Sequence, residues 1–168
     1  MPDVFTRAKR SEVMSRIRSR GNKDTELALL RLLRRHGITG WRRHALVSVA
    51  SGRWQVTRKA RASVLSPVTR HLSLAVRPDF VFKKQRTAIF VDGCFWHGCP
   101  KHATWPANRA AWWRRKIEDN KKRDRVVNFA LRRAGWCVLR VWEHELAKQN
   151  EARLVKRLKS FLKNAEQR

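Results

Sequence analysis

The chain has 168 residues, enough to bury one hydrophobic core in a single compact domain without disulfide bonds. Forty Lys and Arg residues against thirteen Asp and Glu residues give a formal net charge of +27. Such a charge favours a polyanionic partner, because each phosphate that is neutralised releases condensed counterions. The three cysteines argue against a secreted disulfide framework and no stretch reaches the roughly 20 apolar residues of a membrane span, so we expect a cytoplasmic protein without membrane contact.

The N-terminal part of the chain is predicted to be a basic segment followed by an amphipathic helix. Residues 1–22 are polar and basic, and we expect an arm or a short helix ahead of a single domain at 23–168. Leucines recur at helical spacing within 24–36, and Gly37 is a suitable stop. Glu26 lies in the first turn, where a carboxylate complements the helix dipole.

The stretch that follows the helix has weak organisation. No acidic residue occurs from 27 to 78, and residues 47–73 mix Arg, Lys, Ser and Val without a sustained period. We therefore expect a basic loop insertion at about 45–75, which is either functional or a solvated excursion without a role. A short alternation at 54–57 permits a hairpin inside it.

Two strands joined by a basic turn are predicted next, at 77–82 and 87–91. Asp79 lies on the first strand and Asp92 directly follows the second. Carboxylates on neighbouring strands can share a Mg²⁺ ion, and a buried carboxylate requires a metal or a basic partner. The alternative for Asp79 is that it caps a turn, because Pro-Asp is common in turns.

A cluster of metal-ligating residues follows the second strand. Cys94, Cys99 and His102 have the spacing C-x4-C-x2-H, which is close enough to converge on one zinc ion. We expect the fourth ligand to be His144, just after an apolar run that would form a neighbouring strand. Cys137 competes for this position, although a buried free thiol inside a strand is an ordinary outcome.

The same cluster holds a histidine and two large aromatic residues. His97 follows Trp96 on a turn, where a neutral imidazole could act as a general base toward water attacking a phosphate. Its alternatives are a zinc ligand or a surface histidine. Phe95 and Trp96, together with Trp112 and Trp113, are aromatics among basic residues, which can either pack in a core or wedge between bases.

The C-terminal half is predicted to be a long helix at 108–133, a strand at 135–142 and a helix at 151–162. The apolar residues of 135–142 are nearly continuous, which favours a central strand. The order α, loop, β, β, α, β, α is typical of an α/β domain with a mixed β-sheet flanked by helices in two or three layers.

Short motifs spread over most of the chain, apart from about residues 45–75, form one pattern. They are Met14, Thr25-Glu26, Pro78-Asp79, residues 90–100, Trp113, Lys116-Ile117, Asn120, Arg123-Asp124, Gly135-Trp136 and Val141-Trp142-Glu143. In this order and spacing they resemble the very short patch repair (Vsr-type) DNA mismatch endonucleases of bacteria.

The resemblance implies a restriction-endonuclease-like core with a structural zinc site. It implies a Mg²⁺-dependent DNA endonuclease that nicks one strand of double-stranded DNA 5′ of the thymine in a T·G mismatch left by deamination of 5-methylcytosine. A functional link to a companion cytosine-5 DNA methyltransferase and to mismatch-repair proteins would follow, with the enzyme acting as a monomer.

By similarity, Asp79 coordinates Mg²⁺ together with the backbone carbonyl of Val91. His97 is the base or orients the water, and Glu26 lies near the water shell of the metal. The family's zinc positions fall on Cys94, Cys99 and His144, with His102 as the remaining ligand. The residues that intercalate beside the mismatch match Met14, Phe95, Trp96 and Trp113.

Three departures from the family pattern stand out. Asp92 occupies a position where some members have His, so a second carboxylate near the metal acts there as ligand or base. Cys94 stands where other nucleases carry a Lys two residues after a carboxylate, and the segment before Pro78 is longer than usual. The competing functional classes are a non-catalytic, zinc-containing basic nucleic-acid-binding module and a related nuclease with another target.

Overall fold

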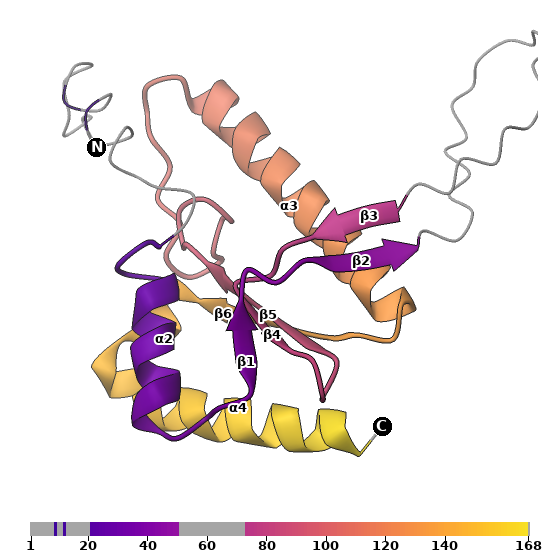
Figure 1. The fold of residues 1–168 in the computed structure, drawn as a ribbon. Helices are drawn as coiled ribbons and strands as arrows, with labels where there is room; N and C mark the ends of the chain where they lie inside the picture. Colours follow the sequence, from indigo (N-terminus) through magenta and orange to yellow (C-terminus); the bar gives the residue numbers. More distant parts are fainter. Residues whose placement is uncertain (1–8, 10–11, 13–20, 51–72, 168) are drawn as a thin grey trace, which may run out of the picture.

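A four-stranded mixed sheet lies between two layers that cover its faces (Figure 1). The computed structural model describes residues 9, 12, 21–50 and 73–167. The strand order is β1-β4-β5-β6, with pairing antiparallel except between β5 and β6. These strands are Trp41–Arg43, Phe80–Phe82, Thr87–Asp92 and Cys137–Trp142. The predicted hairpin and the α/β class with a mixed sheet are therefore confirmed.

Alternate residues of the central strands enter two separate cores. On one face, helices α2 (Glu26–Arg35) and α4 (Glu151–Glu166) bury a cluster that includes Phe80, Ile89 and Val141. On the other face, helix α3 (Ala110–Arg133) packs over Ala88, Val138 and other residues of the sheet. Burial on both faces is what stabilises a short sheet of this kind.

Strand β6 lies at the edge of the sheet, so the prediction that it is central is wrong. Its near-continuous apolar run has a different cause, because helices cover both of its faces. Val138 belongs to the core under α3, whereas Leu139 and Val141 belong to the core shared with α2 and α4. The apolar run therefore indicates that both faces of β6 are covered. It does not indicate how many strands lie beside β6.

The ends of the expected basic loop are paired strands. β2 (Val47–Ala50) and β3 (Ser73–Val76) form an antiparallel ribbon beside α3 (Figure 1). Val47, Val49 and Val76 are buried in the core under α3, which anchors the ribbon there. Residues 51–72, with the alternation at 54–57, lie outside the described part of the chain, as does Met14.

Helix α2 begins and ends close to the predicted bounds. Gly37 has a φ of +62°, and the backbone N–H groups of Gly37 and Ile38 donate to the carbonyls of Arg34 and Leu33. This pairing closes the helix in a Schellman motif, which requires the left-handed conformation that glycine adopts without strain. Among the described residues, no helix is both long and apolar enough to cross a membrane.

Candidate active site and metal-binding cluster

A cleft of about 720 Å³ opens at the end of β5, between α2, α3 and the β3 strand. Its polar lining comes from elements far apart in the sequence. These side chains include Glu26, Asp79, Asp92, His97, Asp124 and Arg140. The cleft therefore brings together all four residues for which the sequence suggested catalytic roles, and it adds two more.

On one side of the cleft, Glu26, His44 and Asp79 form a possible cation site. One ligand atom from each residue lies within 4.8 Å of the other two. Glu26 is only 5% exposed, and its Oε2 lies 3.0 Å from His44 Nε2 and accepts a hydrogen bond from Arg43 at 3.0 Å. Asp79 Oδ2 accepts a hydrogen bond from the Val91 backbone N–H at 2.7 Å.

The pKa of Asp79 is raised to about 6, mainly by burial and in smaller part by the nearby charges of Glu26 and Asp92. The hydrogen bond from Val91 and the charge of Arg140 act in the opposite direction. A carboxylate that is costly to ionise beside a second buried carboxylate is a chemical environment that favours a divalent cation. The donor set fits such an ion, since it supplies two carboxylates and an imidazole.

The raised pKa of Asp79 predicts a pH dependence of stability in the protein without added divalent cation. A carboxyl with an ordinary pKa of 3.8 in the unfolded chain and about 6 in the folded state contributes stability below pH 3.8, and this is lost as pH rises through 6. The free energy of unfolding of the wild type, minus that of Asp79→Asn, should fall by about 2 kcal/mol between pH 4 and pH 7. Urea denaturation at several pH values measures it, and a pH-independent difference would contradict the burial argument.

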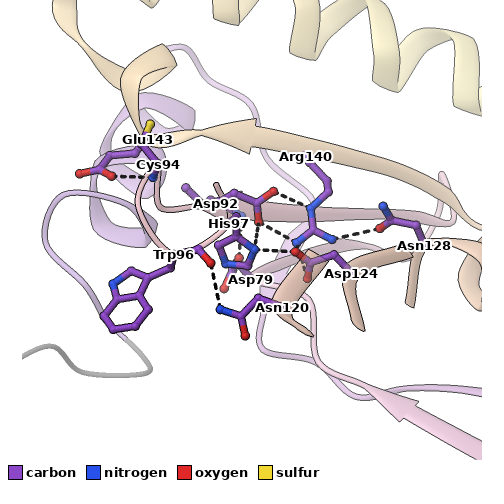
Figure 2. Close-up of polar contacts among 11 residues, drawn as sticks. Asp79, Asp92, Cys94, Trp96, His97, Asn120, Asp124, Asn128, Arg140 and Glu143 are labelled. Atoms are coloured by element: carbon purple, nitrogen blue, oxygen red, sulfur yellow. Dashed lines mark hydrogen bonds and ion pairs between the residues drawn. The ribbon is translucent and has the colours of Figure 1, made fainter. Parts of the chain in front are cut away.

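On the other side of the cleft, His97 pairs with Asp124 of α3 (Figure 2). His97 Nδ1 lies 2.6 Å from Asp124 Oδ2. Burial alone would raise the pKa of Asp124, but the hydrogen bond from His97 and the charge of Arg140 outweigh it and hold this pKa below its ordinary value. An ionised carboxylate can only accept, so Nδ1 carries a proton, and in the neutral form of the ring the lone pair would lie on Nε2, as a general base requires.

Asp92 is paired with Arg140 of β6 and is only 3% exposed. Arg140 donates to both oxygens of Asp92, from Nε at 2.5 Å and from Nη2 at 2.7 Å. Asp92 Oδ1 also lies 3.7 Å from His97 Nδ1. Figure 2 shows these groups as one connected network at the end of β5.

Behind the turn that carries His97, the four expected zinc ligands converge. They are Cys94, Cys99, His102 and His144, and one ligand atom from each lies within 4.8 Å of the others. His144 Nδ1 is 3.2 Å from Cys94 Sγ and 3.7 Å from Cys99 Sγ, and Cys99 Sγ is 3.8 Å from His102 Nδ1. Sulfur and nitrogen ligands at tetrahedral zinc lie about 3.6 Å apart, so the cluster has suitable dimensions.

The protonation chemistry of this cluster also fits a metal. Burial raises the pKa of the Cys94 thiol, so a thiolate there requires a strong local cation. Cys137, the competing fourth ligand, begins β6 and pairs with Thr87 at the opposite end of β5. The parallel register therefore separates Cys137 from the cluster by the length of the strand.

The turn between the two sites is held tightly against α3. Asn120 Nδ2 donates to the Trp96 carbonyl at 2.9 Å. Gly98 has a φ of +59°, and a Cβ there would lie 2.8 Å from Ile117 Cγ2 and 2.6 Å from Lys121 Cε. With the turn held in this way, His97 lies in the cleft while the flanking cysteines face His102 and His144.

The aromatic residues of the turn and of α3 form one cluster. Phe95, Trp96 and Trp113 contact one another with ring centroids 5.1 to 5.8 Å apart. Trp113 is 6% exposed, whereas its neighbour Trp112 is 53% exposed and Trp105 is 50% exposed. Phe95 and Trp96 are partly exposed, so the cluster reaches the protein surface at these two residues.

Sequence reasoning assigned no site role to His44 or Arg140, and it quoted Asp124 only within a motif. Arg140 did carry a signal, because it is the one charged residue in the apolar run 137–142. Asp124 is one of many polar residues on α3, and His44 lies in the stretch without clear periodicity. Only the fold brings Asp124 to the cleft and His44 to Glu26.

Comparison with known proteins identifies relatives along most of the chain. The family described as DNA mismatch endonuclease Vsr matches residues 68–103. A relative described as Type II nicking enzyme V.NmeAIP, from Neisseria meningitidis serogroup A, is 31% identical over 148 residues, which cover 87% of this chain and 85% of the relative.

Two further relatives match over shorter segments. Type II nicking enzyme V.NaeI from Lentzea aerocolonigenes is 53% identical over 70 residues, 42% of each chain. DNA mismatch endonuclease Vsr from Escherichia coli is 40% identical over 97 residues, 54% of this chain and 60% of the relative. For several of the curated relatives, the chain spans only about half of their length.

Proposed function

Because this chain belongs to the Vsr family of DNA mismatch endonucleases, we propose that it nicks one strand of double-stranded DNA 5′ of the thymine in a T·G mismatch. The observation that carries the proposal is the cleft in which a buried acidic site lies opposite an oriented histidine. Nicking requires both the acidic site and the histidine, whereas neither would have a function in a non-catalytic binding module. The net charge of +27 suits a DNA partner.

Asp79 and Glu26 would hold the catalytic cation, with His44 beside them and, by similarity to the family, the carbonyl of Val91 as a further ligand. We propose Mg²⁺, since carboxylate and carbonyl oxygens are the donors it prefers. A bound Mg²⁺ supplies stabilisation of the negative charge that develops on the scissile phosphate.

The histidine supplies the proton transfer. His97 Nε2 is free to accept a proton from the attacking water, because Nδ1 is committed to Asp124. Asp124 then stabilises the imidazolium that forms, in the manner of other acid-oriented histidine bases. The base and the acidic site line the same cleft, so water and phosphate can be placed between them.

The second cluster is proposed to bind a structural zinc ion. Two thiols and two imidazoles at tetrahedral spacing are donors that zinc prefers, and no position is left for substrate. Zinc would tie the turn after β5 to the segment after β6, since Cys94 and His144 come from these two places. Glu143 supports this link by accepting the Cys94 N–H at 3.0 Å.

The aromatic cluster is proposed to open the duplex at the mismatch. Phe95 and Trp96 project from the same turn as His97, so a wedge inserted there would be fixed relative to the scissile phosphate. Trp113 packs behind them, and 6% exposure makes it a support for the wedge in the DNA-free protein. An unstable T·G pair lowers the cost of unstacking.

The proposal is tested with labelled duplexes that differ only at one base pair: T·G, C·G and T·A. Each is incubated with the protein and either Mg²⁺ or EDTA, and products are resolved on a denaturing gel. We expect a nick in the T·G duplex with Mg²⁺ only. Cleavage of all three duplexes would indicate a nuclease with another target, and binding without cleavage would indicate a non-catalytic module.

A further inference from the structure

We propose that Arg140 is a positioning residue for the catalytic base, and that Asp92 serves as its counter-ion and not as a metal ligand. The guanidinium bridges Asp92 and Asp124, and so decides which of the two carboxylates orients His97. The inference rests on the proposed nicking function, because it concerns the base of that reaction. In the sequence, Arg140 is distinguished only as the one charged residue of an apolar strand.

The nitrogens and one face of the Arg140 guanidinium contact described residues. Nε and Nη2 donate to Asp92, Nη2 also lies 3.0 Å from Asp124 Oδ1, and Nη1 donates to Asn128 Oδ1 at 3.2 Å. Its flat face lies 4.9 Å from the centroid of the Phe90 ring. A planar group with its nitrogens and one face engaged has little freedom to rotate, so it can fix what it contacts.

Two carboxylates lie within reach of the same imidazole nitrogen. His97 Nδ1 is 2.6 Å from Asp124 Oδ2 and 3.7 Å from Asp92 Oδ1. Arg140 engages both oxygens of Asp92 but only Oδ1 of Asp124, which leaves Asp124 Oδ2 as the acceptor for His97. Without the guanidinium, the Asp124 carboxylate would no longer be held at Oδ1, and the side-chain oxygen of residue 92, as Asp or as Asn, would be a second acceptor for Nδ1. The ring would then lose its single orientation.

The same contacts separate Asp92 from the cation site. Both of its oxygens accept from Arg140, and the residue is 3% exposed. The ligand group that does gather around Asp79 contains Glu26 and His44. The two aspartates at the end of the hairpin therefore have different partners, one a proposed Mg²⁺ ion and the other a guanidinium.

The test compares variants in one background, because Arg140→Ala alone leaves a buried carboxylate without its partner and is expected to lower the folded fraction. Asp92→Asn is the reference, and Asp92→Asn/Arg140→Ala is the test variant. We expect the double variant to melt within a few degrees of the reference and to bind the T·G duplex with a Kd within about threefold of it. Its single-turnover nicking rate should be about 10²-fold lower, as for the loss of an oriented general base.

Two further measurements separate positioning from simple charge balance. In Arg140→Lys, an ammonium keeps the charge but cannot bridge two carboxylates as a guanidinium does. The nicking rate of Arg140→Lys should therefore stay far below that of the wild type. Free guanidinium at millimolar concentration should restore part of the rate of the double variant. A double variant that nicks as fast as Asp92→Asn would overturn the inference, as would full activity in Arg140→Lys.

A control is available on the other face of the sheet. Arg35 Nη1 contacts both oxygens of Glu151, at 2.9 and 2.8 Å. Arg35→Ala removes this more exposed arginine–carboxylate pair from the α2–α4 layer and should leave the nicking rate unchanged. A similar rate loss in Arg35→Ala would mean that the effect is general and not local.

The state of His97 gives a readout that does not depend on activity. Long-range ¹H–¹⁵N spectra near pH 8 report which ring nitrogen carries the proton, with His97→Gln used for assignment. We expect the proton on Nδ1 in both proteins, with one sharp, strongly downfield Nδ1–H resonance in the wild type and a broadened, less downfield one in Asp92→Asn/Arg140→Ala. If the wild type fails to nick T·G duplexes, the proposed function fails, and an unchanged Nδ1–H resonance in the double variant separately overturns the role of Arg140.

Discussion

Asp79→Ala is expected to abolish nicking of a T·G duplex, with a loss of about 10³-fold or more, because it removes a carboxylate that we propose as a ligand of the catalytic cation. Asp79 lies with Glu26 and His44 in the acidic site, where one ligand atom from each falls within 4.8 Å of the others. Its removal leaves one carboxylate and one imidazole, which is too few donors for a hard cation.

Binding of the mismatched duplex should survive the same substitution. Affinity for DNA rests on phosphate contacts from a chain with 40 Lys and Arg residues and on the wedge residues of the aromatic cluster. The Kd for the T·G duplex should therefore change by less than about threefold at fixed salt. Removing a negative charge from the cleft acts in the direction of slightly tighter binding.

Single-turnover nicking and fluorescence anisotropy, measured on the same preparation, separate the two effects. Glu166→Ala is a suitable control, since it removes an exposed carboxylate at the end of α4. It should leave both nicking and binding at the wild-type level. Equal losses of nicking and binding in Asp79→Ala would contradict a division between cation site and DNA-binding surface.

Cys94→Ser is expected to lose the proposed zinc ion and to lower the yield of folded protein. A structural zinc ion contributes about 10 kcal/mol or more to the folding of small metal-binding segments, and a serine hydroxyl is a poor substitute for a thiolate. Loss of the ion would release the segment that carries His144 from the turn that carries His97. Nicking should fall with it, although Cys94 does not face the cleft.

The third cysteine provides the matched control for this experiment. Cys137→Ser makes the same chemical change at the opposite end of the sheet, beside Thr87. Elemental analysis should find one zinc per chain in the wild type and in Cys137→Ser, and much less in Cys94→Ser. A wild type that is fully folded and free of metal would refute the zinc site.

Local spacing in the sequence was sufficient for much of the fold and for the metal-binding cluster. The turn between 82 and 87 predicted an antiparallel hairpin, and Phe80 indeed lies opposite Ile89. Cys94, Cys99 and His102 are close in sequence, so their convergence needs little knowledge of the fold. To place His144 with them, a further prediction was needed, namely that the strand before His144 pairs with β5 and ends beside the turn that carries Cys94.

The remaining features depend on contacts between distant segments. Arg140 meets Asp92 across 48 residues and Asp124 meets His97 across 27, and no local pattern encodes either pair. Strand β1 has three residues, which is too short for a hydrophobic period to appear. The position of β6 in the sheet could not be predicted either, because a continuous apolar run indicates that both faces of a strand are covered and not whether it is central.

The most direct measurement maps the break in each strand separately. A T·G duplex is labelled at the 5′ end of one strand or of the other, incubated with the protein and Mg²⁺, and compared with size markers on a denaturing gel. The account predicts one break, immediately 5′ of the mismatched thymine, with the guanine strand intact and no product from Asp79→Ala. Cuts in both strands, or cleavage that does not depend on the mismatch, would contradict it.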